Sequence, residues 1–117
     1  FYTTVQQSDG VIISFAEHNG SFTAAYKNLF DWCSRITPKV YENKPLVLLS
    51  TSPGPGGGNS VLSQATHSMP FFGGTVLAAV SLPSFYSNFD RETQRVTDKQ
   101  LDSEISGAIH QLAGHLT

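Results

Sequence analysis

A strand-to-helix transition in residues 11–32 most constrains the fold of this chain. Val11–Phe15 forms a continuous apolar run, which is typical of a strand buried on both faces of a parallel sheet. A short polar loop over residues 16–21 follows, and Ser21 is placed to cap the helix that comes next. Apolar side chains of that helix recur at helical spacing, at Phe22, Ala25, Leu29, Trp32 and Ile36. The segment therefore predicts one strand, one loop and one helix.

Two further apolar runs repeat this arrangement. Residues 46–49 predict a second buried strand, and residues 75–82 predict a third. Strands that start near residues 11, 46 and 75, each followed by a helix, require right-handed crossovers and a parallel sheet. The last helix is expected to begin near Thr97 or Asp98 and to end near Leu116. The chain is therefore predicted to be an α/β protein with one domain over residues 1–117.

Prolines and small polar residues predict where the other helices begin and end. The first long helix is expected to end near Ile36, because Pro38 disfavours a helical conformation in the residue before it. Asn59 or Ser60 is expected to cap a short helix that Pro70 ends. No internal repeat interrupts this pattern.

Composition restricts the partners of the protein. Charged residues make up only 14% of the chain, against roughly 25% in an average protein, and this favours burial of surface in an oligomer. The net charge of −2 gives no indication of nucleic acid or an anionic membrane as a partner. No apolar stretch approaches the length of a membrane span. The single cysteine, Cys33, lies in the apolar stripe of a helix and is expected to be buried and inert, so a cytoplasmic location is expected.

Residues 50–59 contain the longest run of small residues, at the point where the second strand should lead into a helix. Glycine-rich turns can hold phosphates, but a P-loop requires a lysine that Gly58-Asn59-Ser60 lacks. The dinucleotide fingerprint does not fit either. Close approach of the backbone to a flat ligand suits a run without Cβ atoms better, and a flexible loop is the alternative.

The remaining polar residues do not form a catalytic or metal-binding group. His110 and His115 are five residues apart on a helix, so they do not share a face, and His67 has no partner in the sequence. Only His18 lies in a loop at the carboxyl end of a strand. No G-x-S-x-G motif is present, so neither a metal site nor a hydrolase is predicted.

Two loops together carry a family signature. Residues 16–21 read Ala-Glu-His-Asn-Gly-Ser, and residues 27–32 read Lys-Asn-Leu-Phe-Asp-Trp. Residues 50–58 read Ser-Thr-Ser-Pro-Gly-Pro-Gly-Gly-Gly, and residues 82–90 read Leu-Pro-Ser-Phe-Tyr-Ser-Asn-Phe-Asp. These motifs resemble those of the flavodoxin-like NADPH-dependent FMN reductases, whose loops read Pro-Glu-Tyr-Asn-Gly-Ser and Ser-Thr-Ser-Pro-Gly-x-x-Gly-Gly. The resemblance covers essentially the whole chain.

The resemblance implies a fold and a cofactor. It implies a three-layer, flavodoxin-like sandwich with a parallel sheet, to which this chain contributes strands 3, 4 and 5 with their helices. It also implies bound FMN with its ring between the two loops, NAD(P)H as co-substrate, and a small electron acceptor such as a quinone, an azo dye or a free flavin. The cofactor-binding residues it implies are Ala16, Glu17, His18, Asn19, Ser52, Gly54, Gly57 and Gly58. No catalytic acid–base group is expected, because hydride transfer belongs to the cofactor.

The chain departs from the family pattern at both loops. Ala16 and His18 stand where the family usually has proline and tyrosine, so contacts with the flavin ring are expected to change. Pro55 and Gly56 stand where the second loop usually carries arginine, so contacts with NADPH are expected to be fewer.

A larger departure concerns the family's first strands and its Gly-Ser-x-Arg-x-x-Ser phosphate loop, which have no counterpart in these residues. Residues 1–7 are expected to be the tail of the preceding helix, and residues 11–15 to be a central strand with an open edge. The chain is therefore expected to be an N-terminally truncated domain, stable with a complementing segment or as a homo-oligomer. The alternatives are a non-catalytic truncated subunit and a flavodoxin-like electron carrier.

Overall fold

The computed structural model describes residues 1–116 and contains a parallel three-stranded sheet. Its strands are β1 (Val11–Phe15), β4 (Pro45–Thr51) and β5 (Thr75–Leu82), hydrogen-bonded in the order β1-β4-β5. Val11 pairs with Leu46 at one end of the β1–β4 ladder, and Phe15 pairs with Ser50 at the other. The three predicted strands, their parallel direction and their consecutive order are confirmed.

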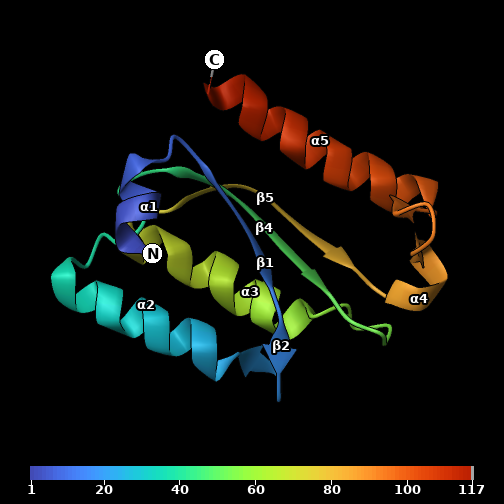
Figure 1. Cartoon of the computed structure of the whole chain (residues 1–117), viewed down its shortest axis with the longest axis horizontal. Helices are drawn as coiled ribbons and strands as arrows, with labels where there is room; N and C mark the ends of the chain where they lie inside the picture. The colour runs from blue at the N-terminus through green and yellow to red at the C-terminus, as the bar shows by residue number, and fades with distance from the viewer. Residues whose placement is uncertain (117) are drawn as a thin grey trace.

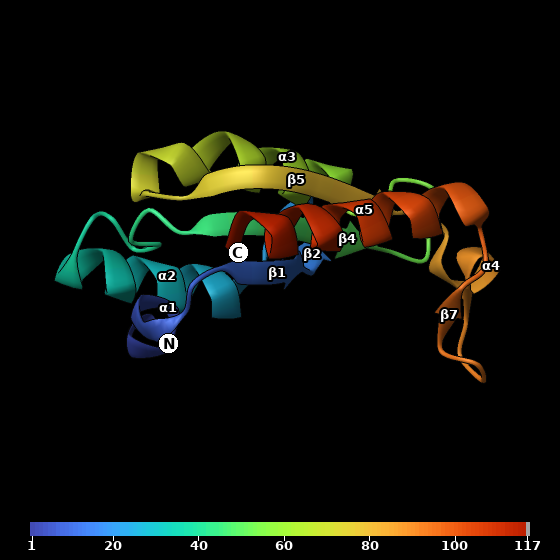
Figure 2. The ribbon, with the colours of Figure 1, turned by 90° about the horizontal axis from the view of Figure 1, so that it is seen from above.

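Helices cover both faces of the sheet, as Figure 1 shows. Helices α2 (Ala24–Ile36) and α3 (Asn59–Ser68) lie on one face, and α5 (Lys99–Leu116) lies on the other. The short helix α1 (Tyr2–Gln7) lies beyond β1, with Val5 buried in the core of the α2–α3 face. No helix among the described residues is long and apolar enough to cross a membrane. Figure 2 shows the strands in the order β5, β4, β1, with α3 beside β5 and α2 nearer β1.

Strand β1 differs from the prediction that both of its faces are buried. Val11, Ile13 and Phe15 pack into the α2–α3 core, but the side chain of Ile12 on the opposite face is 48% exposed. The reason is that β1 is an edge strand among the described residues, while α5 packs against β4 and β5. The predicted open edge is thus confirmed, and complete burial of the strand is wrong.

The start of α2 also differs from the prediction. Ser21 is not the N-cap; Thr23 is, and its Oγ1 accepts a hydrogen bond from the Tyr26 N–H at 3.1 Å. Ser21 instead belongs to β3 (Ser21–Phe22), which pairs antiparallel with β2 (Glu17–His18). The intervening residues 19 and 20 form a tight turn that moves the start of the helix to Ala24.

The helix after β4 begins without the predicted side-chain cap. Its N-cap is Gly58 in the left-handed conformation, so Asn59 and Ser60 are already helical. Helix α3 ends at Ser68, and the 3₁₀-helix η1 (Met69–Phe72) takes up Pro70 in its first turn. Proline is tolerated there because a first-turn N–H has no intrahelical partner.

The segment after β5 contains a short helix and a hairpin. Helix α4 (Phe85–Asn88) is followed by β6 (Phe89–Asp90), which pairs with β7 (Arg95–Val96). The carboxylate of Asp98 accepts a hydrogen bond from the Leu101 N–H at 3.0 Å and so caps the last helix. That helix runs from Lys99 to Leu116, so its predicted start near Thr97 or Asp98 is confirmed.

Candidate functional site

The loops that carry the two signatures lie at one edge of the sheet. Strands β1, β4 and β5 run in the same direction, so their carboxyl ends meet at that edge (Figure 1). The β2–β3 hairpin follows β1, the glycine-rich loop of residues 52–58 follows β4, and α4 follows β5. In open α/β sheets, ligands bind outside the carboxyl ends of the strands. The two sequence-predicted loops are thus neighbours at the edge where a ligand is expected.

The first loop presents three of its four candidate residues to solvent. Ala16 joins β1 to the hairpin and is exposed, as are His18 and Asn19. Asn19 and Gly20 have φ angles of 53° and 79°, the left-handed values of a two-residue hairpin turn. Ala16, His18 and Asn19 are therefore free to contact a ligand.

Glu17 has a different role from its neighbours. Its Oε1 accepts a hydrogen bond from the N–H of Val61 at 2.7 Å. Val61 lies in the first turn of α3, where backbone N–H groups lack intrahelical partners and the helix dipole favours a negative charge. Glu17 thus caps α3 from the neighbouring loop and replaces the side-chain cap that Gly58 cannot supply. This bond fixes the first loop against the helix that follows the second.

The hairpin makes a second contact with α3. The Ser21 hydroxyl donates to Gln64 Oε1 at 2.8 Å, and Gln64 Nε2 donates to the Gly20 carbonyl at 3.4 Å. The hairpin is thereby held along α3 at two points, through Glu17 and through Gln64.

In the second loop, the carbonyl of Gly57 is held from two strands. The Ser50 hydroxyl at the end of β4 donates to it at 2.7 Å, and the Ser81 hydroxyl in β5 donates at 2.9 Å. Gly57 has a φ of +60°, and a Cβ there would lie 2.2 Å from Ser81 Oγ. A Cβ on Gly58 would lie 2.9 Å from the Cβ of Ser50. Both glycines are therefore required for packing of the loop against the sheet.

The other part of this loop faces open space. An added Cβ on Gly54 or Gly56 would meet nothing within 4 Å. The Gly54 carbonyl accepts hydrogen bonds from the Ser52 hydroxyl at 3.2 Å and from the Ser84 N–H at 2.8 Å. The Phe85 N–H donates to the Ser52 carbonyl at 3.0 Å. The loop after β5 thus supports the exposed backbone of residues 54–56.

Sequence reasoning missed three contributors to this edge. Ser50 and Ser81 were not singled out, although each is a hydroxyl at or near the end of an apolar strand. The hairpin was missed although Asn19-Gly20 is a strong signal for a two-residue turn. The described residues contain no cluster of histidine, cysteine, aspartate or glutamate that could hold a metal ion.

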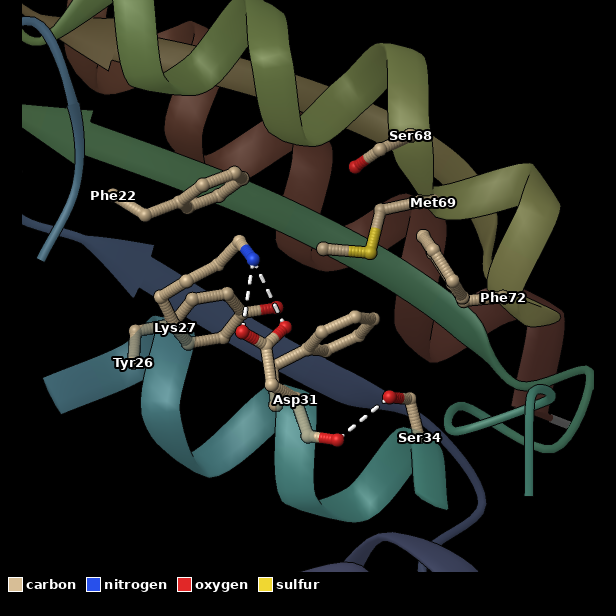
Figure 3. A pocket seen from close by; sticks show the side chains of 9 residues that line it. Phe22, Tyr26, Lys27, Asp31, Ser34, Ser68, Met69 and Phe72 are labelled. Carbon is tan, nitrogen blue, oxygen red and sulfur yellow. Dashed lines mark hydrogen bonds and ion pairs between the residues drawn. The ribbon is translucent and has the colours of Figure 1, made fainter. Parts of the chain in front are cut away.

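A hollow of about 190 Å³ lies away from this edge, between α2 and the α3–η1 segment. Figure 3 shows it lined by aromatic side chains and Met69, with the Lys27–Asp31 ion pair beside it. It contains none of the eight candidate residues. Tyr26 lines this hollow, and its hydroxyl is hydrogen-bonded to the Tyr41 hydroxyl at 2.6 Å. Burial raises the pKa of Tyr41 to about 12 and that of Tyr26 further, so both are neutral at physiological pH.

Comparison with solved structures identifies the fold. FerB, a flavoenzyme NAD(P)H:(acceptor) oxidoreductase from Paracoccus denitrificans, matches with a TM-score of 0.72 at 22% identity, over 97% of this chain and 66% of that one. An oxidoreductase from Corynebacterium diphtheriae matches with a TM-score of 0.72 at 17% identity, over 98% of this chain and 59% of that one. The predicted flavodoxin-like fold is confirmed.

Sequence comparison finds relatives that are named as quinone reductases or quinone oxidoreductases. The chain is 29% identical to a quinone reductase of Escherichia coli (strain K12) over 114 residues, which are 97% of this chain and 57% of that protein. It is 38% identical to an NADPH:quinone oxidoreductase of Arabidopsis thaliana over 60 residues, or 51% of this chain and 30% of that protein. Nearly the whole of this chain therefore matches the E. coli quinone reductase, but it covers only 57% of the length of that protein.

A protein-family comparison covers the β-strand core and both loops. The model for NADPH-dependent FMN reductases matches residues 1–88, a range that contains all eight candidate residues and the three strands of the sheet. The chain belongs to the NADPH-dependent FMN reductase family.

Proposed function

We propose that this chain forms the flavin-ring side of an FMN-containing oxidoreductase that takes hydride from NAD(P)H and reduces a small acceptor of the quinone type. The names of the E. coli and A. thaliana relatives support the reaction class. The observation that carries the proposal is the pair of loops joined at one sheet edge by the Glu17–Val61 hydrogen bond. FMN, when bound, supplies the hydride chemistry, and the protein supplies binding and orientation.

The residues at this edge fit a flat, polar ring system. Gly54 and Gly56 have no side chain and face open space, so their backbone can approach a ring closely. On the opposite loop, Ala16, His18 and Asn19 are exposed, and the last two offer hydrogen-bonding groups. Ser52 is held next to Gly54. These six residues are the proposed ring contacts.

Glu17, Gly57 and Gly58 are proposed to act through these contacts. Glu17 is committed to the N–H of Val61, and Gly57 is fixed by Ser50 and Ser81. Preorganised loops hold a ligand without a further cost in loop entropy. These three residues are therefore positioning residues for the ring, and substitution should change affinity by moving the loops.

We also propose that residues outside this chain hold the FMN phosphate. The open edge of β1 offers unpaired backbone groups to another strand, and such pairing would extend the sheet beside the first loop. The exposed face at Ile12 is the surface that a further helix could cover. The isolated chain is then expected to bind FMN more weakly than about 1 μM. Tighter binding in a flavin fluorescence titration would contradict this part of the proposal.

The reaction is tested by adding NADPH anaerobically to the protein with FMN and recording flavin absorbance. Bleaching by NADPH, followed by recovery when a quinone is added, is the expected result. Flavin that binds but stays oxidised would indicate an electron carrier, and absence of flavin binding with any added partner segment would indicate a non-catalytic subunit.

A matched pair of variants tests the proposed location of the flavin ring. Gly54→Val should fold normally, because the added Cβ meets nothing within 4 Å, and should weaken FMN binding by roughly tenfold or more by filling the approach to the ring. Gly107→Val is the control, since Gly107 is equally unobstructed but lies in α5. Equal FMN affinity in both variants would place the ring elsewhere.

A further inference from the structure

Two tyrosine hydroxyls on the α2–α3 face share a single hydrogen bond. The Tyr26 and Tyr41 oxygens lie 2.6 Å apart, and either of them could be the donor. Each phenol carries one hydrogen, so the hydroxyl that accepts this bond keeps a hydrogen of its own to donate. Within residues 1–116, no acceptor lies in hydrogen-bond contact with that hydrogen. The pair therefore has one donor that is not satisfied.

Burial decides which of the two hydroxyls keeps the free hydrogen. Tyr41 is fully buried and does not line the hollow between α2 and the α3–η1 segment, whereas Tyr26 is partly exposed and does line it. A buried donor without an acceptor is strongly unfavourable. The Tyr41 hydroxyl is therefore expected to donate to the Tyr26 oxygen, which leaves the Tyr26 hydrogen free on the side of the hollow. In Figure 3 the hydroxyl end of Tyr26 points in the direction of Met69, another residue of the lining.

The rest of the lining is apolar or already hydrogen-bonded. The hydroxyls of Ser34 and Ser68 each donate to a backbone carbonyl of the same helix, at 2.7 and 3.1 Å. Among residues 1–116, the Tyr26 hydroxyl is thus the one hydroxyl of the lining without an acceptor. The walls are formed by apolar side chains, those of Phe22, Phe30, Met69 and Phe72.

Charge and size limit the ligand that this hollow can take. At its rim, Lys27 Nζ lies 2.9 Å from Asp31 Oδ2, so the two charges neutralise one another and a neutral ligand is favoured. The hollow has a volume of about 190 Å³. An apolar cavity of about 150 Å³ is large enough to bind benzene. There is therefore room for one six-membered ring with a small substituent.

We propose that this hollow binds a neutral, monocyclic aromatic molecule whose carbonyl oxygen accepts the free hydrogen of the Tyr26 hydroxyl. The ring of the ligand packs against the phenylalanine rings and the Met69 sulfur, contacts that aromatic molecules favour. The hollow contains none of the eight candidate residues, so it is a second site, and the proposal does not depend on the proposed function.

Two ligands that differ in one oxygen test the hydrogen bond. Acetophenone carries the carbonyl oxygen, and ethylbenzene has nearly the same shape without it. Acetophenone is expected to bind with a Kd of roughly 0.1–1 mM. Ethylbenzene should bind roughly two- to tenfold more weakly, because it leaves the Tyr26 hydrogen without an acceptor.

Met69 reports where the ligand binds. It is the only methionine of the chain and it lines the hollow, so NMR of protein with isotope-labelled methionine methyl groups follows one resonance at the site. Both ligands should shift this resonance, because an aromatic ring changes the local magnetic field. An unchanged Met69 resonance, or equal affinities for acetophenone and ethylbenzene, would overturn the proposal.

Two tyrosine variants separate the roles of the two hydroxyls. Tyr26→Phe should lower the affinity for acetophenone to that for ethylbenzene, because the donor to the carbonyl oxygen is removed. Tyr41→Phe is the matched control: the Tyr26 hydroxyl remains, so the preference for acetophenone should remain. A preference that survives Tyr26→Phe would exclude the proposed hydrogen bond.

Filling the hollow tests the location by a route that leaves both tyrosines in place. Ser34→Leu should abolish binding of both ligands, because the larger side chain occupies the space that Ser34 now lines. Ser103→Leu is the control, since Ser103 is an exposed serine of α5, and it should leave both affinities unchanged. Thermal unfolding followed by circular dichroism establishes that each variant is folded. Undiminished binding to folded Ser34→Leu protein would overturn the proposal.

Discussion

The two faces of the sheet differ greatly in how much apolar surface they bury. The α2–α3 face holds a large core in which side chains of β1, β4, both helices and α1 meet. Among residues 1–116, the core cluster on the α5 face consists of Val47, Ala108 and Leu112, with partly buried side chains of β4 and β5 around them. Hydrophobic stabilisation grows with the apolar area removed from water, so most of the folding free energy comes from the α2–α3 face.

This asymmetry matters for the candidate site. The hairpin leads into α2, and the glycine-rich loop leads into α3, so both signature loops are attached to helices of the better-packed face. Helix α5 contributes no candidate residue and leaves Ile12 of β1 uncovered. The part of the molecule that positions the proposed ring contacts is thus the part that is packed most tightly.

The largest expected effect comes from removing one side chain from each core. Leu48→Ala should lower the free energy of unfolding by about 3–5 kcal/mol, because Leu48 is fully buried in the α2–α3 core. Leu112→Ala should cost about 2 kcal/mol, because the smaller α5 core can relax around the loss. Urea unfolding followed by circular dichroism measures both values. Equal losses would show that the two faces contribute alike.

The elements could be predicted from sequence better than their ends. The periodicity of apolar residues predicts β1, β4, β5, α2 and α5, because burial on a helix or strand face repeats at a fixed spacing. The predicted face of α2 is wrong, however: Leu29, Trp32 and Ile36 are exposed, and the helix buries Phe30 and Cys33 instead. The predicted start of α2 was wrong because the chain forms a two-residue turn at Asn19, which places Ser21 in a strand instead of at the helix N-cap. The local sequence is compatible with both a hairpin turn at Asn19 and a helix cap at Ser21, and the pairing of β2 with β3 determines which of them forms.

The candidate site was predictable in outline but not in its internal contacts. Both loops follow from sequence motifs, and the resemblance assigned all eight residues to cofactor binding. The bond from Glu17 to Val61 and the two hydroxyls on the Gly57 carbonyl join residues far apart in the chain. Such contacts depend on the register of the parallel strands, which a single sequence does not specify.

A smaller effect is expected at the bond that joins the hairpin to α3. Glu17→Ala should lower the free energy of unfolding by about 1–2 kcal/mol, because the Val61 N–H loses its acceptor at a helix N-terminus. Glu17→Gln keeps an acceptor oxygen and should cost less. Amide hydrogen exchange should report faster exchange at the start of α3 in the alanine variant. Unchanged exchange there would exclude a capping role.

The buried tyrosine pair makes the α2–α3 face sensitive to alkaline pH. Tyr41 has a pKa of about 12 in the folded state, and that of Tyr26 is also raised, against about 10 in the unfolded chain. Above pH 10 the unfolded state loses protons that the folded state keeps, so the free energy of unfolding falls as pH rises. In the double variant Tyr26→Phe/Tyr41→Phe, the free energy of unfolding should fall less steeply between about pH 9.5 and 11 than in the wild type, because the two titrating hydroxyls are absent. Equal slopes in both proteins would indicate that neither hydroxyl is buried.

The smallest expected effect is that of substituting Ile12, which is adjacent to Ile13 in β1 but faces the opposite side of the sheet. Ile12→Thr should change the free energy of unfolding by about 0.5 kcal/mol or less, because Ile12 is 48% exposed on the face that α5 leaves open. Ile13→Thr is the matched comparison and should cost about 1–3 kcal/mol, since its hydroxyl would enter the α2–α3 core. Chemical unfolding of both variants gives the difference directly. A large loss in Ile12→Thr would mean that a second chain covers this face in solution, in which case the loss should grow with protein concentration.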